Sequence, residues 1–519
     1  MNAVDRFWEF VSPQVALKRE AARIKLNMVR SIQNSGYDEG GASTKRNAMK
    51  GWYAESLSPQ EDIDLNLNTL RQRSRSLFMT APLATSAIKT NRTNVVGAGL
   101  KLKSRVDFKA LGISHEAADQ LEKQIEREFN LWAESKRCDN LGLNDFYELQ
   151  QVALMSWLIN GDCFALIKHL PTTDYMPYGL KVHLIEGDRI ATPQATGDYL
   201  NLRYKAPNGN RIYNGVEIDK EGAVVAYHIC NAYPDSSLDV QKEWRRVEAF
   251  GAQTGLSNVL QVMEAERPDQ YRGVPYLATV IESLKQLTRY TEAELMAAVI
   301  NAFFTVFVKS ESPAETARDF EGVVDEEAPI ETPDYKLGPG AINILNEGES
   351  IEIADAKRPN VNFDGFVSAM AKYIGAALEI PYELLTKSFT SSYSASRAAL
   401  LEAWKAFKMR RTWFANDFCQ PIYEIWLCEA VARGRIQAPG FFNDPAIRKA
   451  YSRADWNGPA PGQLDPVKEV TAAAKRVENG FSTRERETIE MNGGDFDRNI
   501  EQLVLENEKM QAISKREGA

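Results

Sequence analysis

The stretch "AELMAAVINAFFTVFVKS", residues 293–310, is the most apolar run in the chain, and its interpretation decides the fold. From Leu295 to Val308 it contains no charged residue, and Asn301 is its one strongly polar side chain. A helix that crosses a membrane needs about 20 apolar residues, which is more than this run offers. We therefore expect the run to be covered by protein, either by its own core or by a neighbouring chain.

Residues around this run have the spacing of a long helix that leads into strands. Residues 277–302 predict an amphipathic helix about 39 Å long. Its apolar face is formed by Leu277, Ile281, Leu284, Leu287, Leu295 and Ala298. The residues that follow, 303–308, are aromatic or β-branched and favour a strand. Residues 341–355 predict two more short strands.

Composition is that of a soluble globular protein. The 519 residues suffice for two to four domains, and 44% are hydrophobic and 26% charged. The five cysteines form no C-x-x-C pair, which favours a reducing compartment with free thiols. The first residues lack an apolar segment long enough for a signal peptide, so we expect a soluble protein, cytoplasmic when made. The net charge of −9 argues against tight general binding to DNA.

An acidic segment holds most of the excess negative charge. Residues 311–334 contain nine acidic residues and one basic residue, Arg318, so this segment carries −8 of the net −9. Low hydrophobicity with high charge favours an exposed, mobile insertion. The alternative is a negatively charged surface, repeated in each subunit of an assembly, that repels DNA or docks a basic partner. The candidate docking residues are Glu321, Asp325, Glu326 and Glu327.

The remaining sequence predicts an α+β fold. Helical spacing indicates helices over 13–34, 59–82, 83–96, 114–135, 146–161, 364–378 and 395–432, the last kinked at Pro421, and short helices after 465. Alternation over 100–106 predicts a strand. Residues 163–230 read as several strands, with Asn208-Gly209 and Asn214-Gly215 as turns. Ser482 with Glu485 has the spacing of a capping box.

Motifs for common enzyme chemistry are missing. There is no G-x-x-x-x-G-K-[ST], G-x-S-x-G or H-E-x-x-H. Three of the four histidines lie in the predicted β region, but their spacing does not suit a metal site, and packing roles are favoured. We therefore expect no enzymatic activity, no catalytic residues, no metal and no cofactor.

Several segments, in this order, resemble the portal proteins of lambda-like tailed phages. They are "ALKREAARIKLNMVRSI" (16–32), "LRQRSRSLF" (70–78), "NVVGAGLKLKS" (94–104), "LINGDCFALI" (158–167), "IEGDRIATP" (185–193), "RPDQYRGVPYLATVIESL" (267–284), "ALEIPYELLT" (377–386), "SSYSASRAALLEAWKAF" (391–407) and "LDPVKEVTAAAKRVENGFST" (464–483). Each is weak alone, and the ordered set is specific. Residues 310–346 match least.

The resemblance implies a portal-protein fold, assembled as a ring, usually a dodecamer, at one capsid vertex. Double-stranded DNA would enter and leave through its channel, and terminase and head-tail connector proteins would dock on it. Major capsid and scaffold proteins would be further partners, with no membrane. The ring would assemble in the host bacterial cytoplasm and stay in the virion. The implied parts are an N-terminal arm with a basic helix (1–50), wing (51–276), stem helix (277–302), clip (303–355), returning stem helix and turn (356–385), tunnel loop (386–397), long kinked helix and wing return (398–463) and crown (464–519).

The Ser/Thr-rich segment 386–397 would be the tunnel loop that touches DNA. Its candidate residues are Lys387, Ser388, Phe389, Thr390, Ser391, Ser392, Tyr393 and Arg397. The plainer interpretation is a surface loop. Basic residues of the long helix, Lys405, Lys408, Arg410 and Arg411, could face DNA, but intersubunit pairing or solvent is favoured. The same holds for Arg71, Arg73 and Arg75 and for the alternating Lys101, Lys103 and Arg105.

Other functions stay open at this point. The N-terminal basic helix could lie on a membrane, but its few large apolar residues favour contact with DNA or the capsid wall. The protein could instead be another ring-forming virion connector or baseplate protein. A packaging ATPase-nuclease is disfavoured because the P-loop is missing.

Overall fold

The computed structural model describes residues 51–193 except Tyr53, 204–237, 241–302, 306–310, 349–353, 362–389, 392–463 and 465–517. Before residue 51 it describes Lys18, Ala22, Lys25 and 47–49. The chain divides into two units, Met1–Ser58 and Pro59–Ala519. The predicted N-terminal helix over 13–34 falls mostly outside the described residues, and the acidic segment 311–334 falls outside them entirely.

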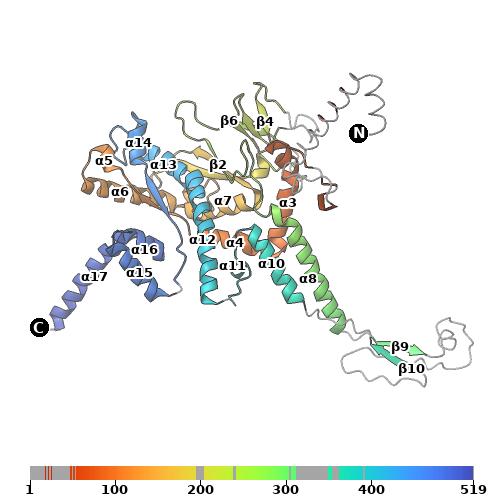
Figure 1. Cartoon of the computed structure of the whole chain (residues 1–519). Helices are drawn as coiled ribbons and strands as arrows, with labels where there is room; N and C mark the ends of the chain where they lie inside the picture. The colour runs from red at the N-terminus through yellow and green to blue at the C-terminus, as the bar shows by residue number, and fades with distance from the viewer. Residues whose placement is uncertain are drawn as a thin grey trace, which may run out of the picture. The chain divides into compact units, whose positions relative to one another are not determined.

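The larger unit mixes helices and strands, as predicted, and Figure 1 shows their arrangement. Its first half contains α3 (Leu65–Thr80), α4 (Pro82–Val95), β1 (Lys101–Ser104), α5 (Phe108–Leu111), α6 (His115–Ala133), α7 (Phe146–Asn160), β2 (Asp162–His169), β3 (Leu180–Glu186), β4 (Arg211–Tyr213), β5 (Val216–Ile218), β6 (Val224–Cys230), β7 (Trp244–Glu248) and β8 (Val259–Met263). Its second half contains α8 (Ile281–Ala302), β9 (Val306–Ser310), β10 (Glu349–Ile353), α10 (Phe363–Ala377), α11 (Tyr382–Thr386), α12 (Tyr393–Phe414), α13 (Gln420–Ala432), α14 (Pro445–Tyr451), β11 (Ala454–Asn457), α15 (Pro466–Glu478), α16 (Arg484–Asn492) and α17 (Phe496–Glu517).

Among the described residues, the strands form four antiparallel sheets. The largest has the order β4-β5-β6-β7, and a second has the order β3-β2-β8. The β4–β5 hairpin turns at Asn214 and Gly215, whose φ angles of 43° and 84° suit the tight turn predicted there. Strand β1 pairs with β11, so that Lys101 lies opposite Asn457. The strand over 100–106 was predicted correctly, whereas β7, β8 and this distant pairing were not.

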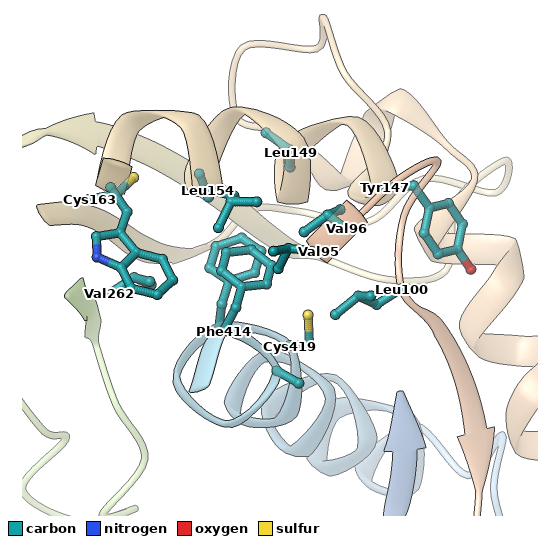
Figure 2. Close-up of a cluster of buried hydrophobic side chains, with 14 of the residues drawn as sticks. Val95, Val96, Leu100, Tyr147, Leu149, Leu154, Cys163, Val262, Phe414 and Cys419 are labelled. Carbon is teal, nitrogen blue, oxygen red and sulfur yellow. The ribbon is translucent and has the colours of Figure 1, made fainter. Parts of the chain in front are cut away.

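The main hydrophobic core joins the two halves of the unit. In Figure 2, Phe414 and Cys419 lie near Val95, Val96 and Leu154, which come from distant parts of the sequence. All five side chains are fully buried. Each large apolar side chain that is buried stabilises the folded state by about 1.5–3 kcal/mol. Helices α12 and α13 are therefore fixed to the helices and sheet of the first half.

The kink predicted at Pro421 is present and has a specific form. A π-helical turn at Ala415–Cys419 separates α12 from α13, and Pro421 lies in the first turn of α13. Proline is tolerated there because the first turn of a helix needs no donor from its backbone nitrogen. Two details differ from prediction. The cap of α16 is Thr483 instead of the box at Ser482, and the turn after α10 contains the short helix α11.

Helix α8 confirms the predicted long helix and lies beside α10 (Figure 1). Tyr290 of α8 packs on Phe363 and Phe366, with ring centroids 5.7 and 4.7 Å away. The first half of α8 is buried through Leu284 and Leu287, but Leu295, Met296 and Val299 are exposed. Beyond α8, β9 pairs with β10, so the strands predicted near 303–308 and in the second half of 341–355 are confirmed. Within the described residues, no helix is long and apolar enough to span a membrane.

Candidate nucleic-acid interface

The segment predicted as a tunnel loop is shorter than its predicted bounds, 386–397. Thr386 ends α11, and residues from Tyr393 to Arg397 form the first turns of α12. Lys387, Ser388, Phe389 and Ser392 lie between the helices, whereas Thr390 and Ser391 lie outside the described residues. Arg397 is therefore a helical residue, because Ser392 begins the helix earlier than the Ser/Thr composition suggested.

The start of this segment is anchored to α4. Lys387 has a left-handed backbone, with φ 58°, and its ammonium Nζ donates a hydrogen bond of 2.8 Å to Thr90 Oγ1. The Ser86 hydroxyl donates to the Leu385 carbonyl at 2.6 Å. Partial burial lowers the pKa of Lys387. The ammonium group predicted to meet phosphates is thus held by a residue of its own chain.

The end of the segment is fixed by the start of α12. The Ser392 hydroxyl accepts a hydrogen bond from the Ala395 backbone nitrogen at 3.4 Å, as helix caps do. Arg397 lies 3.8 Å from Glu469 of α15. Between these anchors the Phe389 side chain is 62% exposed, beside small hydroxyl side chains. An exposed aromatic ring carries no charge, so it can touch double-stranded DNA without the phosphate contacts that dominate tight binding.

The four basic candidates of α12 have different surroundings. Arg410 is buried and donates to the side chains of Asn91 and Glu379, so the expectation of solvent or intersubunit contact is wrong for it. Lys405 is exposed and pairs with Glu402 one turn away, and Lys408 is exposed and lies 3.7 Å from Glu490. Arg411 is largely buried and donates to the backbone carbonyls of three residues at 2.8–2.9 Å: Asn94, Val95 and Pro459. Burial lowers its pKa to about 10. Arg411 thus uses its donors inside its own chain, and we do not carry it forward as a contact to DNA or to another subunit.

A buried ion cluster was missed by sequence reasoning. Asp162, at the start of β2, accepts from Arg71 and Arg272, each at 2.7 Å, and from the Gly273 backbone nitrogen at 3.2 Å. All three charged side chains are nearly or fully buried. The two arginines keep the pKa of the Asp162 carboxyl below its usual range, against the effect of burial.

The expectation of solvent or intersubunit contact for Arg71 and Arg75 is therefore wrong. Arg75 pairs with Asp188 and with the Asn160 side chain. One feature of the sequence could have indicated this cluster. Asp162 follows Asn160-Gly161 inside an otherwise apolar stretch, and a carboxylate that is buried there requires a cation as its partner. Sequence spacing could not say which arginine supplies it.

Lys103 and Arg105 of the predicted strand also have partners within the chain. Lys103 is only 9% exposed and pairs with Asp495 and Asp497, and Arg105 pairs with Asp455 and Glu485. The favoured interpretation for this set, solvent or a neighbouring subunit, is wrong for both residues. Lys101 instead lies over the Tyr147 ring, 3.4 Å from its centroid.

His228 lies in a polar cluster on β5–β7. Its Nε2 is 3.0 Å from Glu217, which also accepts from Arg246 at 2.7 Å. Hydrogen bonds from Arg246 and its neighbours lower the pKa of Glu217 to about 2, despite burial. In the part of the chain that the structure describes, no group of three His, Cys, Asp or Glu side chains could hold a metal ion. The acidic docking candidates, from Glu321 to Glu327, fall outside the described residues.

Known proteins similar to this chain come from tailed phages. The family model for the phage portal protein, lambda family, matches residues 45–411. Portal protein B of Escherichia phage lambda is 26% identical over 498 residues, which cover 92% of this chain and 90% of that protein. The portal protein of Escherichia phage N15 is 25% identical, covering 92% and 91%. A probable portal protein of Halomonas phage phiHAP-1 is 24% identical, covering 79% and 74%.

Solved structures with a related arrangement come from gene transfer agent particles. A chain of the native particle virion has a TM-score of 0.42 and 12% identity, over 82% of this chain and 93% of that chain. A chain of the native particle neck, computed with C12 symmetry, has a TM-score of 0.39 and 13% identity, over 80% and 93%.

Proposed function

The chain belongs to the lambda family of phage portal proteins, and on this premise we propose that it forms the DNA channel at one vertex of a phage capsid. The observation that carries the proposal is the family match, which covers residues 45–411, from before α3 through most of α12. Double-stranded DNA would enter the capsid through the ring during packaging and leave through it on ejection. The relatives named above are portal proteins, and no enzymatic role is proposed here.

A ring explains the exposed apolar side chains of the α8–α10 pair. Leu295 and Met296 are 67% and 62% exposed in the single chain, and Phe366 and Tyr373 of α10 are exposed as well. Exposed apolar patches of this kind mark surfaces that another protein covers. In a closed ring each subunit offers the same two faces to its neighbours, so all copies can be covered. We propose a dodecamer, with stems packed side by side.

The segment after α11 would reach toward the DNA. Phe389, Ser388 and the hydroxyl residues up to Ser392 would line the narrowest part of the channel, while Lys387 holds the near end to α4. Exposed Lys405 and Lys408 remain proposed contacts to DNA or to a neighbouring subunit. Tight binding of phosphate would slow the passage of DNA, so a weakly interacting lining suits a channel.

Partners follow from the same plan. We propose that the acidic residues Glu321, Asp325, Glu326 and Glu327 offer a docking surface to the terminase large subunit, which supplies the ATPase. Head-tail connector proteins would bind at the same end of the ring once packaging is complete. Major capsid and scaffold proteins would contact the wing, during assembly in the host bacterial cytoplasm.

One substitution tests the ring. Val299 is 43% exposed on α8, and Val299→Asp places a charge on the proposed subunit contact. We expect the folded monomer to persist with an unchanged circular dichroism spectrum, while negative-stain images lose their rings. Gln286→Glu is the matched control: it adds a negative charge at an exposed position of α8, thirteen residues away and therefore on another face of the helix, and should leave rings intact. Normal rings from Val299→Asp would contradict the proposed stem packing.

A second experiment tests the DNA-lining segment. Phe389→Ala should leave rings intact and change the rate or completeness of DNA packaging in a defined packaging reaction with terminase. Tyr175→Ala, which removes a 90% exposed aromatic ring from the β2–β3 connection, is the control for a general surface effect. Equal packaging by both variants would remove Phe389 from the channel lining.

A further inference from the structure

Helices α15, α16 and α17, residues 465–517, contribute little to the hydrophobic core. No described residue of this segment belongs to either cluster of buried apolar side chains. Its buried residues among those described are Ala473 and Glu487. Large apolar side chains such as Phe481, 80% exposed, face solvent instead. Apolar burial in the described part of this segment is therefore small, and polar contacts must help to hold these helices to the rest of the unit, which we call the body (59–463).

Ion pairs supply the contacts with β1 of the body. Lys103 Nζ lies 3.0 Å from Asp495 and 3.3 Å from Asp497. Arg105 lies 2.6 Å from Glu485. Carboxylates of α16, of α17 and of the residues between them thus surround Lys103 of β1 and Arg105, the residue that follows the strand.

Further pairs follow the same sign pattern on other elements. Lys123 of α6 lies 2.7 Å from Glu501. On α12, Arg397 lies 3.8 Å from Glu469 and Lys408 lies 3.7 Å from Glu490. In these ion pairs of the described residues, the body provides the cation and the C-terminal segment provides the carboxylate. Arg476 of α15 and Arg486 of α16 pair with carboxylates of their own segment.

Helices α15 and α16 are joined by a contact of their own, and each has its own cap. Arg476 of α15 donates two hydrogen bonds to Glu487 of α16. Asp465 caps α15 and Thr483 caps α16. These contacts do not involve the body, so they can persist when the contact with the body is broken.

The body cations also have partners of their own. Arg105 lies 2.8 Å from Asp455, Lys123 lies 3.4 Å from Asp119, and Lys103 lies 3.9 Å from Glu126. If the C-terminal helices separated, each of these cations would keep an acidic neighbour and gain water. Separation therefore leaves no isolated buried charge, which is the outcome that makes breaking a buried ion pair costly.

We infer that residues 465–517 form a module that docks on the body by charge complementarity and that salt can release while the body stays folded. Salt shortens the range of such interactions, from about 10 Å at 0.1 M to about 3 Å at 1 M. Apolar burial in the body is not screened in this way. Because Arg397 and Lys408 lie on α12, docking also restrains the helix that begins beside Phe389. This inference goes beyond the channel function and does not depend on it.

Hydrogen–deuterium exchange on the full-length protein tests the inference. Between 0.05 and 1 M NaCl we expect amides of α16 and α17 to exchange about tenfold faster because the ion pairs are screened. Amides of α7 and α13 should change little, and those in the first turns of α12 should exchange faster together with the module. Equal exchange in α16 and α17 at the two salt concentrations would overturn the inference. Release of the module without change in α12 would overturn the proposed restraint of α12.

Substitutions separate charge from other causes. Lys103→Met at 0.05 M NaCl should reproduce the effect of salt on α16 and α17, whereas Lys449→Met, which removes a pair with Glu424 inside the body, should not. Lys103→Glu combined with Asp495→Lys should restore part of the protection lost in Lys103→Glu alone. The proposal would be wrong if amides of α16 and α17 exchanged at the same rate in the Lys103→Met variant and the unmodified protein. It would also be wrong if amides of the body lost as much protection as those of the module.

Discussion

Two regions of this protein depend on ion pairs, and they use them in opposite ways. Around Asp162 the charges are buried, and each is held by several hydrogen bonds from α3, β2 and the residues after β8. Between the body and the C-terminal module, Lys103 is buried, but the other charged side chains of the contact are 25–62% exposed. The first cluster is part of the core, whereas the second is a contact between two separately held pieces.

The difference shows that burial decides what an ion pair does. A buried charge that loses its partner stays buried and destabilises the fold by several kcal/mol, about 3–5 in measured cases. An exposed pair contributes about 0–1 kcal/mol and weakens with salt. The same residue types can therefore fix a core in one place and give a reversible contact in another.

Removing the buried carboxylate should have the largest effect. Asp162→Ala leaves Arg71 and Arg272 without their shared partner, so we expect a loss of about 3–5 kcal/mol in the free energy of unfolding. Urea unfolding followed by tryptophan fluorescence measures it, with soluble yield as a second readout. Glu501→Ala, which removes an exposed pair with Lys123 at the contact between the body and the module, is the control and should cost under about 1 kcal/mol. Similar losses in both variants would erase the distinction between the two regions.

Two basic residues of α12 extend the comparison within one helix. Arg411→Met leaves three backbone carbonyls without a donor, and we expect a loss of about 2–3 kcal/mol in the free energy of unfolding. Lys405→Met should change it by less than about 0.5 kcal/mol, because that side chain is exposed. Thermal unfolding of the two variants in parallel gives the comparison. A small change in the free energy of unfolding of Arg411→Met would show that water donates to the three carbonyls in place of the arginine.

Acid should weaken the polar cluster on β5–β7. The pKa of Glu217 is about 2 in the folded protein, below its unfolded value near 4.5, so the folded state holds fewer protons between these values. Its stabilising contribution, about 1–3 kcal/mol, is present above pH 4.5 and is lost as the pH falls toward 2. Glu217→Gln should flatten this part of the stability curve, measured by urea midpoints at several pH values. An unchanged slope would assign the acid sensitivity to other carboxyls.

The smallest expected effect concerns Glu126, which lies at the module contact. Burial, with a further contribution from Asp495, raises the pKa of Glu126 to about 7, although Lys103 opposes the shift. Asp495, Asp497 and Glu122 are the other carboxyls around this lysine. If separation of the module lowers this pKa, docking binds a proton, so docking is favoured below pH 7 and weakens as the pH rises through it.

Hydrogen exchange at pH 6 and pH 8, corrected for the intrinsic pH dependence of exchange, measures this effect. We expect about a threefold loss of protection in α17 on going to pH 8, which follows from a shift of about half a pKa unit. Glu126→Gln should remove the pH dependence, while Glu478→Gln, on α15, should keep it. A pH dependence that survives Glu126→Gln would assign it to another group.

Much of this protein is determined by local sequence. The periodicity over 277–302 and 146–161 predicts helices that form at those positions, because a helix places every third or fourth side chain on one face. The turn at Asn214-Gly215 and the interruption at Pro421 are equally local, since they follow from which backbone angles these residues allow. The ordered motifs identify the family without reference to coordinates.

Only the tertiary structure decided which charges are partners. Arg71 and Asp162 are 91 positions apart, and Lys103 and Asp495 are 392 apart, so no spacing in the sequence relates them. The sequence alone grouped Arg411 with Lys405 as basic residues of one helix, yet one is held by backbone carbonyls and the other faces water. The physical reason is that a charge acts through its distance to other charges and its access to water, and folding sets both.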